Sequence, residues 1–174
     1  LGRILISGIF DSTDNLDVWQ NRCKDIFVVE SKGGSYGYTW NSLPQIPYTG
    51  TLIVNHYDDY DHLLSQETRF KTDLDYKEES GYGTLYLNEG LSRTTPKGLL
   101  TGKRVKFTDG NGNIIGETVT AYYYDYRGRV VQTKSYNHLG GIDFVYTAYD
   151  FTGHPTQKKL VHTSSQAGTQ TEVY

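Results

Sequence analysis

The chain has 174 residues and a formal net charge of −3, and its length favours one domain or one large fragment of a domain. Its 20 acidic and 17 basic residues are interspersed, which argues against a binding surface for nucleic acids. No apolar run approaches the roughly 18 residues that span a bilayer, and Leu1–Phe10 lacks the charged lead and cleavage site of a signal peptide. We therefore expect neither a membrane span nor a signal peptide. Because methionine is absent, we expect these residues to belong to a longer chain, which would be their first partner.

Tyrosine, glycine and cysteine carry most of the compositional information about the fold. The 16 tyrosines outnumber the 6 phenylalanines, and a ring with a polar hydroxyl suits a half-buried sheet face. The 19 glycines are scattered without a collagen-like period, as expected for many short turns. Cys23 is the only cysteine, so an internal disulfide is excluded and a buried, unreactive thiol is expected.

The predicted elements are almost all strands. Helical periodicity is limited to residues 14–24, where Leu16, Trp19 and Cys23 are three and four positions apart and Asp14 or Asn15 can cap the start. Runs rich in β-branched and aromatic residues, separated by turn residues, predict nine short strands and a mainly antiparallel all-β fold. These predicted strands cover residues 3–9, 26–31, 50–57, 83–88, 104–108, 114–126, 129–136, 142–150 and 156–163.

Two other segments have a different character. Residues 33–47 have the composition of a loop, although Tyr36, Tyr38 and Trp40 alternate as in a strand, so strand and loop both remain open. Residues 61–82 are polar and charged with little periodicity, which predicts a long surface excursion with some helix. We treat residues 1–174 as a single domain or fragment.

A short motif occurs twice in the last third of the chain. Tyr124-Asp125-x-x-Gly128-Arg129 is followed, 25 positions later, by Tyr149-Asp150-x-x-Gly153-His154. The aromatic residue ends a strand, the aspartate accepts backbone N–H groups, and the glycine supplies the positive φ of a tight turn. Each copy therefore predicts a β-hairpin that must stack on its neighbours.

Weaker copies of the motif lie earlier in the chain. Asp109 and Gly112 fit the same frame, and Tyr57-Asp58 fits it if Asp61 takes the place of the glycine. The segment from Phe10 is a fainter echo, with Asp14 in that place, since aspartate tolerates the left-handed region better than most residues.

The motif that runs from Tyr124 to Val130 resembles the YD-repeat of the Rhs family, which includes bacterial Rhs toxins, components of insecticidal toxin complexes and the animal teneurins. Residues 54–63, 97–113 and 122–155 resemble the region before the core in Rhs-repeat proteins of Gram-negative gut bacteria. The likeness covers residues 54–163 and is strongest from Lys97 onward. Within residues 1–53, only the stretch GRILISGIFDSTDN resembles the family.

This resemblance implies a strip of antiparallel hairpins that, in full-length relatives, coils into a hollow β-shell around a C-terminal cargo. It also implies an extracellular or cell-surface location. A panel of such a shell would have exposed edge strands, so self-association through an edge is expected as well.

Two groups of side chains have the chemistry of metal ligands. Asp109, Asn111 and Asn113 alternate as in a calcium loop, but Ile114 replaces the glycine at the sixth place and Thr120 the glutamate at the twelfth. A second group surrounds the first Tyr-Asp pair, and a solvated turn is the favoured interpretation there. We predict neither a metal nor another cofactor. The members of the second group are His56, Asp58, Asp59, Asp61 and His62.

Enzymatic motifs are missing from the sequence. No GxSxG elbow, HExxH motif, P-loop or dinucleotide fingerprint is present, and the pair Glu78-Glu79 lies in a charged segment. His138, His154 and His162 are expected at the surface or at a sheet edge rather than as general bases. Arg129 is expected to cover a tyrosine or to pair with a carboxylate. The prediction is a non-enzymatic structural segment that serves encapsulation or cell contact.

An alternative function uses the tyrosine-rich surface. Rings next to polar groups recognise sugars and proteins, and the candidate contacts are Trp40, Tyr36, Tyr38 and Tyr123. The neighbouring Tyr48, Tyr122 and Tyr124 belong to the same set. In this alternative the chain is a module that binds a glycan or a protein at a cell surface, while cross-strand packing of the rings is the competing explanation.

Overall fold

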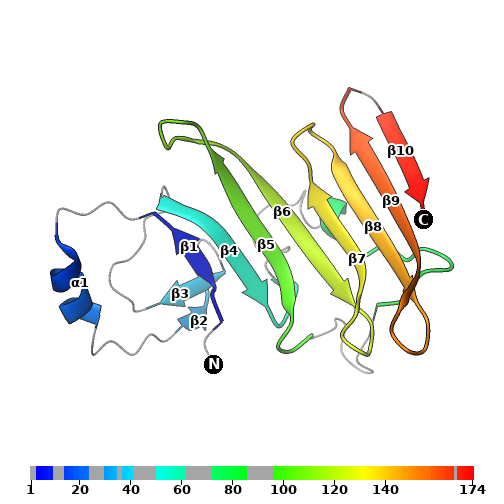
Figure 1. Ribbon diagram of the computed structural model, residues 1–174, viewed down its shortest axis with the longest axis horizontal. Helices are drawn as coiled ribbons and strands as arrows, with labels where there is room; N and C mark the ends of the chain where they lie inside the picture. The colour runs from blue at the N-terminus through cyan, green and yellow to red at the C-terminus, as the bar shows by residue number, and fades with distance from the viewer. Residues whose placement is uncertain are drawn as a thin grey trace.

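The computed structural model of the chain describes residues 3–9, 14–23, 30–34, 37–40, 50–61, 72–85, 96–166 and 168–174. Within these residues, eight strands form one open antiparallel sheet in the order β1-β4-β5-β6-β7-β8-β9-β10, and β2 and β3 form a second sheet (Figure 1). The expected antiparallel all-β fold is confirmed. The strands of the large sheet are β1 (Ile6–Gly8), β4 (Thr51–Tyr57), β5 (Leu100–Thr108), β6 (Ile114–Tyr124), β7 (Val130–Tyr136), β8 (Ile142–Tyr149), β9 (Pro155–Ser164) and β10 (Gly168–Val173).

The small N-terminal elements also follow the sequence pattern. The second sheet pairs β2 (Glu30–Lys32) with β3 (Tyr38–Trp40), so the alternation around Tyr38 does correspond to a strand. The helix α1 (Leu16–Cys23) begins where expected, and the side-chain oxygen of Asn15 accepts the Val18 N–H at 3.0 Å as an N-cap. This helix is too short to cross a membrane, and none of the described helices is long and apolar enough to do so. The side chain of Cys23 and residues 24–29 lie outside the described part of the chain.

The strand predictions differ from the structure at four places, and the first is β1, which begins at Ile6 rather than at residue 3. β5 begins at Leu100, four residues before its predicted start. Residues 83–85, which were expected to begin a strand, are irregular, and residues 86–88 lie outside the described residues. β10 was not predicted, because its sequence GTQTEV is polar and lacks the apolar alternation that marks a half-buried strand.

The buried core lies on one face of the central strands. Val119, Ala121 and Tyr123 alternate along β6 and are at most 3% exposed. The cross-strand register places Gln132 and Lys134 of β7 on the same face. We call this surface of β6, β7 and β8 the covered face.

The segment that covers this face is the second half of the polar excursion. Leu74 is fully buried in a cluster with Tyr60 and Tyr123, and Tyr76 and Leu85 pack against that cluster. In Figure 1 this segment runs behind β7 and β8. The predicted surface excursion over residues 61–82 is thus exposed at most of its described positions from 72 onward, but it anchors Leu74 in the core, which the sequence did not predict. The apolar and aromatic residues of this segment are too few to show a period, but they are enough to close the core.

Candidate functional site

The repeated motif forms the same turn at each contiguous copy. In the Asp125 copy, the backbone N–H of Asp125 donates to the Arg129 carbonyl at 2.9 Å, and the N–H of Gly128 donates to the Asp125 carbonyl at 3.0 Å. The Asp125 carboxylate accepts the N–H groups of Arg127 and Arg129, both at 2.9 Å. The Asp109 and Asp150 copies repeat these bonds.

The glycine of each copy has the predicted positive φ. Its values are +84° at Gly112, +73° at Gly128 and +99° at Gly153. A side chain is strained in this region, so the glycine is what allows the chain to reverse in so few residues. The hairpin prediction is confirmed for the copies at Asp109, Asp125 and Asp150. The alternating oxygens around Asp109 are therefore part of a hairpin turn.

The Tyr57-Asp58 copy is split by a long insertion. The Asp58 N–H donates to the Leu99 carbonyl at 3.2 Å, and the Gly98 N–H donates to the Asp58 carboxylate at 2.6 Å. Gly98, with φ +83°, thus occupies the place of Gly128, and residues 59–97 are inserted between the two halves of one turn.

The split copy corrects the predicted role of two aspartates. Asp61 does not replace the glycine, and neither Asp61 nor Asp14 has a positive φ; among the described non-glycine residues only Asp58 does, at 74°. The sequence alignment failed here because the glycine of this turn lies 40 positions beyond its aspartate.

A β-bulge follows each of these four turns. The register shifts where Asp58, Asp109, Asp125 and Asp150 end their strands, so that one extra residue of the returning strand stays unmatched. The extra residues are Thr101, Ile115, Val131 and Thr156. A bulge bends a strand and increases its twist, so the motif contributes curvature to the sheet as well as reversing the chain.

A fifth turn of the same kind was missed by the sequence analysis. The Asn137 side-chain oxygen accepts the N–H groups of Leu139 at 3.0 Å and Gly141 at 2.9 Å, and Gly140 has φ +72°. The pattern of aromatic residue, Asx, two spacers and glycine is present from Tyr136, so it could have been found. β7 and β8 pair without a register shift, so this turn lacks the bulge.

Successive turns alternate between the two ends of the sheet, because neighbouring strands run in opposite directions (Figure 1). The turns at Asp58, Asp125 and Asp150 share one end, and those at Asp109 and Asn137 share the other. The 25-residue spacing of the motif is therefore the length of two strands with their turns.

Arg129 connects two turns at the shared end. Its guanidinium contacts the Asp125 carboxylate at 2.6 and 2.7 Å and donates to the Asp150 carbonyl at 2.9 Å. The same group lies 4.7 Å from the centre of the Tyr149 ring. Both predicted roles of Arg129, covering a tyrosine and pairing with a carboxylate, are therefore confirmed.

Arg3 occupies the equivalent place two hairpins earlier in the sheet and was not identified from the sequence. It precedes β1, which pairs with β4, as Arg129 precedes β7, which pairs with β8. Its guanidinium contacts the Asp58 carboxylate at 2.8 and 3.0 Å and lies 4.7 Å from the centre of the Tyr57 ring. The tyrosines that precede the aspartates also bind the neighbouring strand. Tyr124 donates to the Leu100 carbonyl at 2.5 Å, and Tyr149 donates to the Val130 carbonyl at 2.9 Å.

The turn carboxylates act as hydrogen-bond acceptors. The side-chain amide of Asn113 and the turn N–H groups lower the pKa of Asp109. The hydroxyl of Thr152, with the N–H groups of its turn, lowers the pKa of Asp150. His154 is exposed, and its Nδ1 lies 2.7 Å from the Thr152 hydroxyl of its own turn. A lowered pKa keeps a carboxylate ionised, which suits a structural acceptor better than a proton-transfer group.

One aspartate–histidine pair lies away from the turns. His162 Nδ1 is 2.6 Å from Asp143 Oδ1, so His162 is a paired residue of β9 rather than a bare surface histidine. The register places Ser135 opposite Asp143, and Asp143 opposite His162. In a catalytic triad the histidine lies between the serine and the carboxylate, so this order does not activate the serine.

The candidate ligand-contact aromatics do not form a common surface in the described residues. Tyr123 is 2% exposed, and its hydroxyl donates to the Leu74 carbonyl at 2.5 Å, so the prediction that it contacts a glycan or protein from an exposed face is wrong. Its position on β6 points it toward the covering segment. Tyr38 stacks on His56 at 5.6 Å, and its hydroxyl accepts the Tyr57 N–H. Tyr36 and the side chain of Trp40 lie outside what the structure describes.

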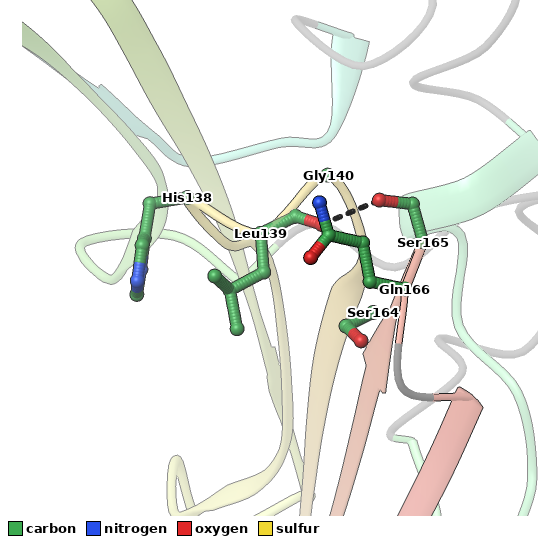
Figure 2. A pocket seen from close by; sticks show the side chains of 6 residues that line it. All are labelled: His138, Leu139, Gly140, Ser164, Ser165 and Gln166. Atoms are coloured by element: carbon green, nitrogen blue, oxygen red, sulfur yellow. Dashed lines mark hydrogen bonds between the residues drawn. The ribbon is translucent and has the colours of Figure 1, made fainter.

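A small pocket lies at the end of the sheet away from the Asp125 and Asp150 turns. It is formed between the Asn137 turn and the β9–β10 connection (Figure 2). Figure 2 shows the Ser165 hydroxyl, which bonds to the Leu139 carbonyl at 3.0 Å. His138 is the one titratable side chain among its described lining residues, so no second group is present for acid–base chemistry. Among the described residues, no three His, Cys, Asp or Glu side chains are placed to hold a metal ion. His62 lies outside them.

Comparison of the chain with protein-family models, with curated proteins and with solved structures gives no match.

Proposed function

We propose that this chain is a non-catalytic structural segment of a secreted or cell-surface protein of the Rhs/YD-repeat type. In this role its hairpins form part of a curved wall that encloses another part of the same protein or contacts another cell. The observation that carries the proposal is the contact of Arg129 with both Asp125 and Asp150. Such a contact joins one hairpin to the next, so the array can be extended by further hairpins.

The use of polar groups at the turns supports a structural role. The Asp125 side chain is only 7% exposed, and its oxygens are engaged by backbone N–H groups and by Arg129. Reactive carboxylates usually lie in a cleft with a partner of shifted pKa. These carboxylates instead hold the chain reversals and the bulges, which determine how strongly the sheet curves.

The competing function, a glycan- or protein-binding module, has weaker support. Tyr123 belongs to the core, and the Tyr38 ring and hydroxyl are engaged with His56 and Tyr57. A binding surface would then depend on aromatic residues other than these two. We therefore propose the structural function in preference.

Electron cryomicroscopy of the full-length protein, combined with limited proteolysis, tests the proposal. The expected result is a curved wall that contains this sheet and shields another part of the chain from protease. Arg129→Ala should increase cleavage of the shielded part. The matched control is His154→Ala, since His154 contacts Thr152 of its own turn.

A different outcome would support the binding module instead. A sheet with both faces exposed to solvent in the full-length protein would contradict the structural proposal. Binding on a glycan array that is lost in Tyr38→Ala would favour the competing function.

A further inference from the structure

The covering segment is held on the sheet largely through its main chain. The Tyr123 hydroxyl donates to the Leu74 carbonyl at 2.5 Å, and the Lys134 ammonium donates to the Asp75 carbonyl. Gln132 makes a double contact with Lys77, because its amide nitrogen donates to the Lys77 carbonyl at 2.6 Å and its oxygen accepts the Lys77 N–H at 3.1 Å. Three side chains of β6 and β7 thus bind four main-chain groups of residues 74–77.

These three side chains are polar, whereas a sheet face that is buried only by packing usually carries apolar side chains. Gln132 and Lys134 are 1% and 4% exposed, and Tyr123 is 2% exposed. Burying an amide or an ammonium costs free energy unless it is hydrogen-bonded. Here the hydrogen-bond partners are backbone groups of another segment. Recognition of a peptide through its main chain tolerates different side chains at the contacted positions. The covered face therefore has the chemistry of a peptide-binding site.

Side chains of the segment add selectivity. Leu74 fills the apolar centre of the site, where it is fully buried, and Tyr76 packs edge-on against Tyr123 with ring centres 5.5 Å apart. An acidic residue lies at each end of the bound stretch. Asp73 accepts a hydrogen bond from the Tyr136 hydroxyl at 2.8 Å, and Glu79 contacts the Lys159 ammonium at 2.7 Å. The site fits an acidic peptide of the pattern Asp-Leu-x-Tyr-x-x-Glu.

The split turn makes the segment separable from the sheet. The Asp58 N–H donates to the Leu99 carbonyl as the N–H groups of Asp109, Asp125 and Asp150 donate to the fifth residue of their turns, although 39 residues lie between Asp58 and Gly98. The chain reversal from β4 to β5 is thus closed by the Asp58 N–H to Leu99 carbonyl bond and by the Gly98 N–H to the Asp58 carboxylate, at the point where the insertion leaves and returns, while the Leu99 N–H donates to the Pro96 carbonyl within the insertion. The insertion is then held on the covered face by non-covalent contacts.

We propose that the covered face of β6–β8 is a binding site for a short acidic peptide, and that residues 73–79 are the ligand it holds within the same chain. The site recognises main-chain groups through Tyr123, Gln132 and Lys134, and it selects for leucine, tyrosine and flanking acids. It lies on a face of the sheet rather than at the turns, so the proposal is independent of the structural function above.

The test uses the full chain with two inserted protease sites, one after Gln66 and one after Gly90. After cleavage every residue is still present, residues 67–90 become a separate peptide, and residues 1–66 remain joined to residues 91–174 through the pairing of β4 with β5. We expect it to remain bound in gel filtration and to exchange with a fluorescent synthetic peptide of residues 72–85, measured by anisotropy. Circular dichroism should show an unchanged sheet. Loss of the β signal or aggregation upon cleavage would make the segment an integral part of the fold and would overturn the proposal.

Three controls identify the recognition as main-chain binding. A peptide N-methylated at Lys77 loses the donor to Gln132 and should bind about tenfold more weakly or worse, whereas N-methylation at Ser80 should have little effect. Gln132→Leu in the protein should weaken the unmodified peptide by a similar factor and should abolish the difference between the two methylated peptides. A scrambled peptide of the same charge should bind at least about tenfold more weakly. Equal binding of the Lys77-methylated or the scrambled peptide contradicts the proposal.

Discussion

The turns at Asp125 and at Asn137 have the same internal hydrogen bonds but join their neighbours in opposite ways. The fifth residue of the Asp125 turn is Arg129, whose long side chain reaches the next turn at that end. The corresponding residue of the Asn137 turn is Gly141, where an added Cβ would lie 2.0 Å from the Thr163 carbonyl oxygen. Local residues determine the shape of each turn, and this one position determines whether hairpins are joined by a side chain or by direct backbone contact.

The largest effect is expected for a substitution at the backbone contact between Gly141 and Thr163. Gly141→Ala should lower the free energy of unfolding by about 4 kcal/mol or more, because the clash involves backbone atoms of β9 that the neighbouring strands hold in place. Urea unfolding followed by circular dichroism measures the change. Gly110→Ala is the control, since nothing lies within 4 Å of a Cβ there, and it should stay within about 0.5 kcal/mol of the parent. Equal stability of both variants would remove the proposed contrast between the two ends.

The next effect tests the side-chain connection. Asp125→Ala removes the acceptor of two turn N–H groups and also the partner of Arg129, which is only 23% exposed. We expect a loss of about 3 kcal/mol. Asp109→Ala removes the same turn acceptor from an exposed copy whose fifth residue is Asn113, and should cost clearly less than Asp125→Ala. If the two variants lose the same stability in urea unfolding, the arginine contributes nothing beyond the turn.

The contiguous turns could be predicted because all of their bonds lie within five residues. The aspartate, glycine and returning strand are adjacent in the sequence, so the motif alone is enough. The same reasoning could have found the Asn137 turn. It could not pair Asp58 with Gly98, which requires knowing that 39 intervening residues leave and return at one point.

The covered face was harder to predict for a similar reason. Leu74 is buried by contact with Tyr60 and with Tyr123, which lies 49 positions away. No local period marks Leu74 as a core residue, since its neighbours Asp73 and Asp75 are acidic. The polar residues of the segment are mostly exposed, as their polarity indicates, and what the sequence could not show is that Leu74 between them reaches the core.

The basic residues of the turns and of the covered face have different partners. Arg129 has a carboxylate partner, whereas Lys134 donates to a main-chain carbonyl, and burial lowers its pKa to about 8 despite the nearby Asp75. In the unfolded chain lysine keeps a pKa near 10.5, so between pH 8 and 10 the unfolded state binds more protons and stability rises with pH. The expected gain is about 2 kcal/mol.

Tyrosine reverses this trend at higher pH. Burial raises the pKa of Tyr124 to about 12, and it also raises the pKa of Tyr60. Above pH 10 the unfolded state therefore loses protons first, and stability should fall. Urea midpoints measured from pH 7 to 11 should pass through a maximum near pH 10, and Lys134→Met should flatten the rising limb. A rising limb of the same slope in Lys134→Met would assign it to another group.

The smallest expected effect separates the two arginines that occupy equivalent places. Arg3 and Asp58 contact each other with side chains that are 39% and 38% exposed, whereas the Arg129–Asp125 pair is mostly buried. Exposed ion pairs contribute little, since solvent screens them and two long side chains must be ordered. Arg3→Ala should therefore cost less than about 1 kcal/mol and lose its effect at high salt, while Arg129→Ala should cost about 2 kcal/mol and depend little on salt. Unfolding in urea at low and at high sodium chloride measures both. An equal, salt-sensitive loss in the two variants would mean that burial does not distinguish these pairs, and that the connection at Arg129 is no stronger than a surface contact.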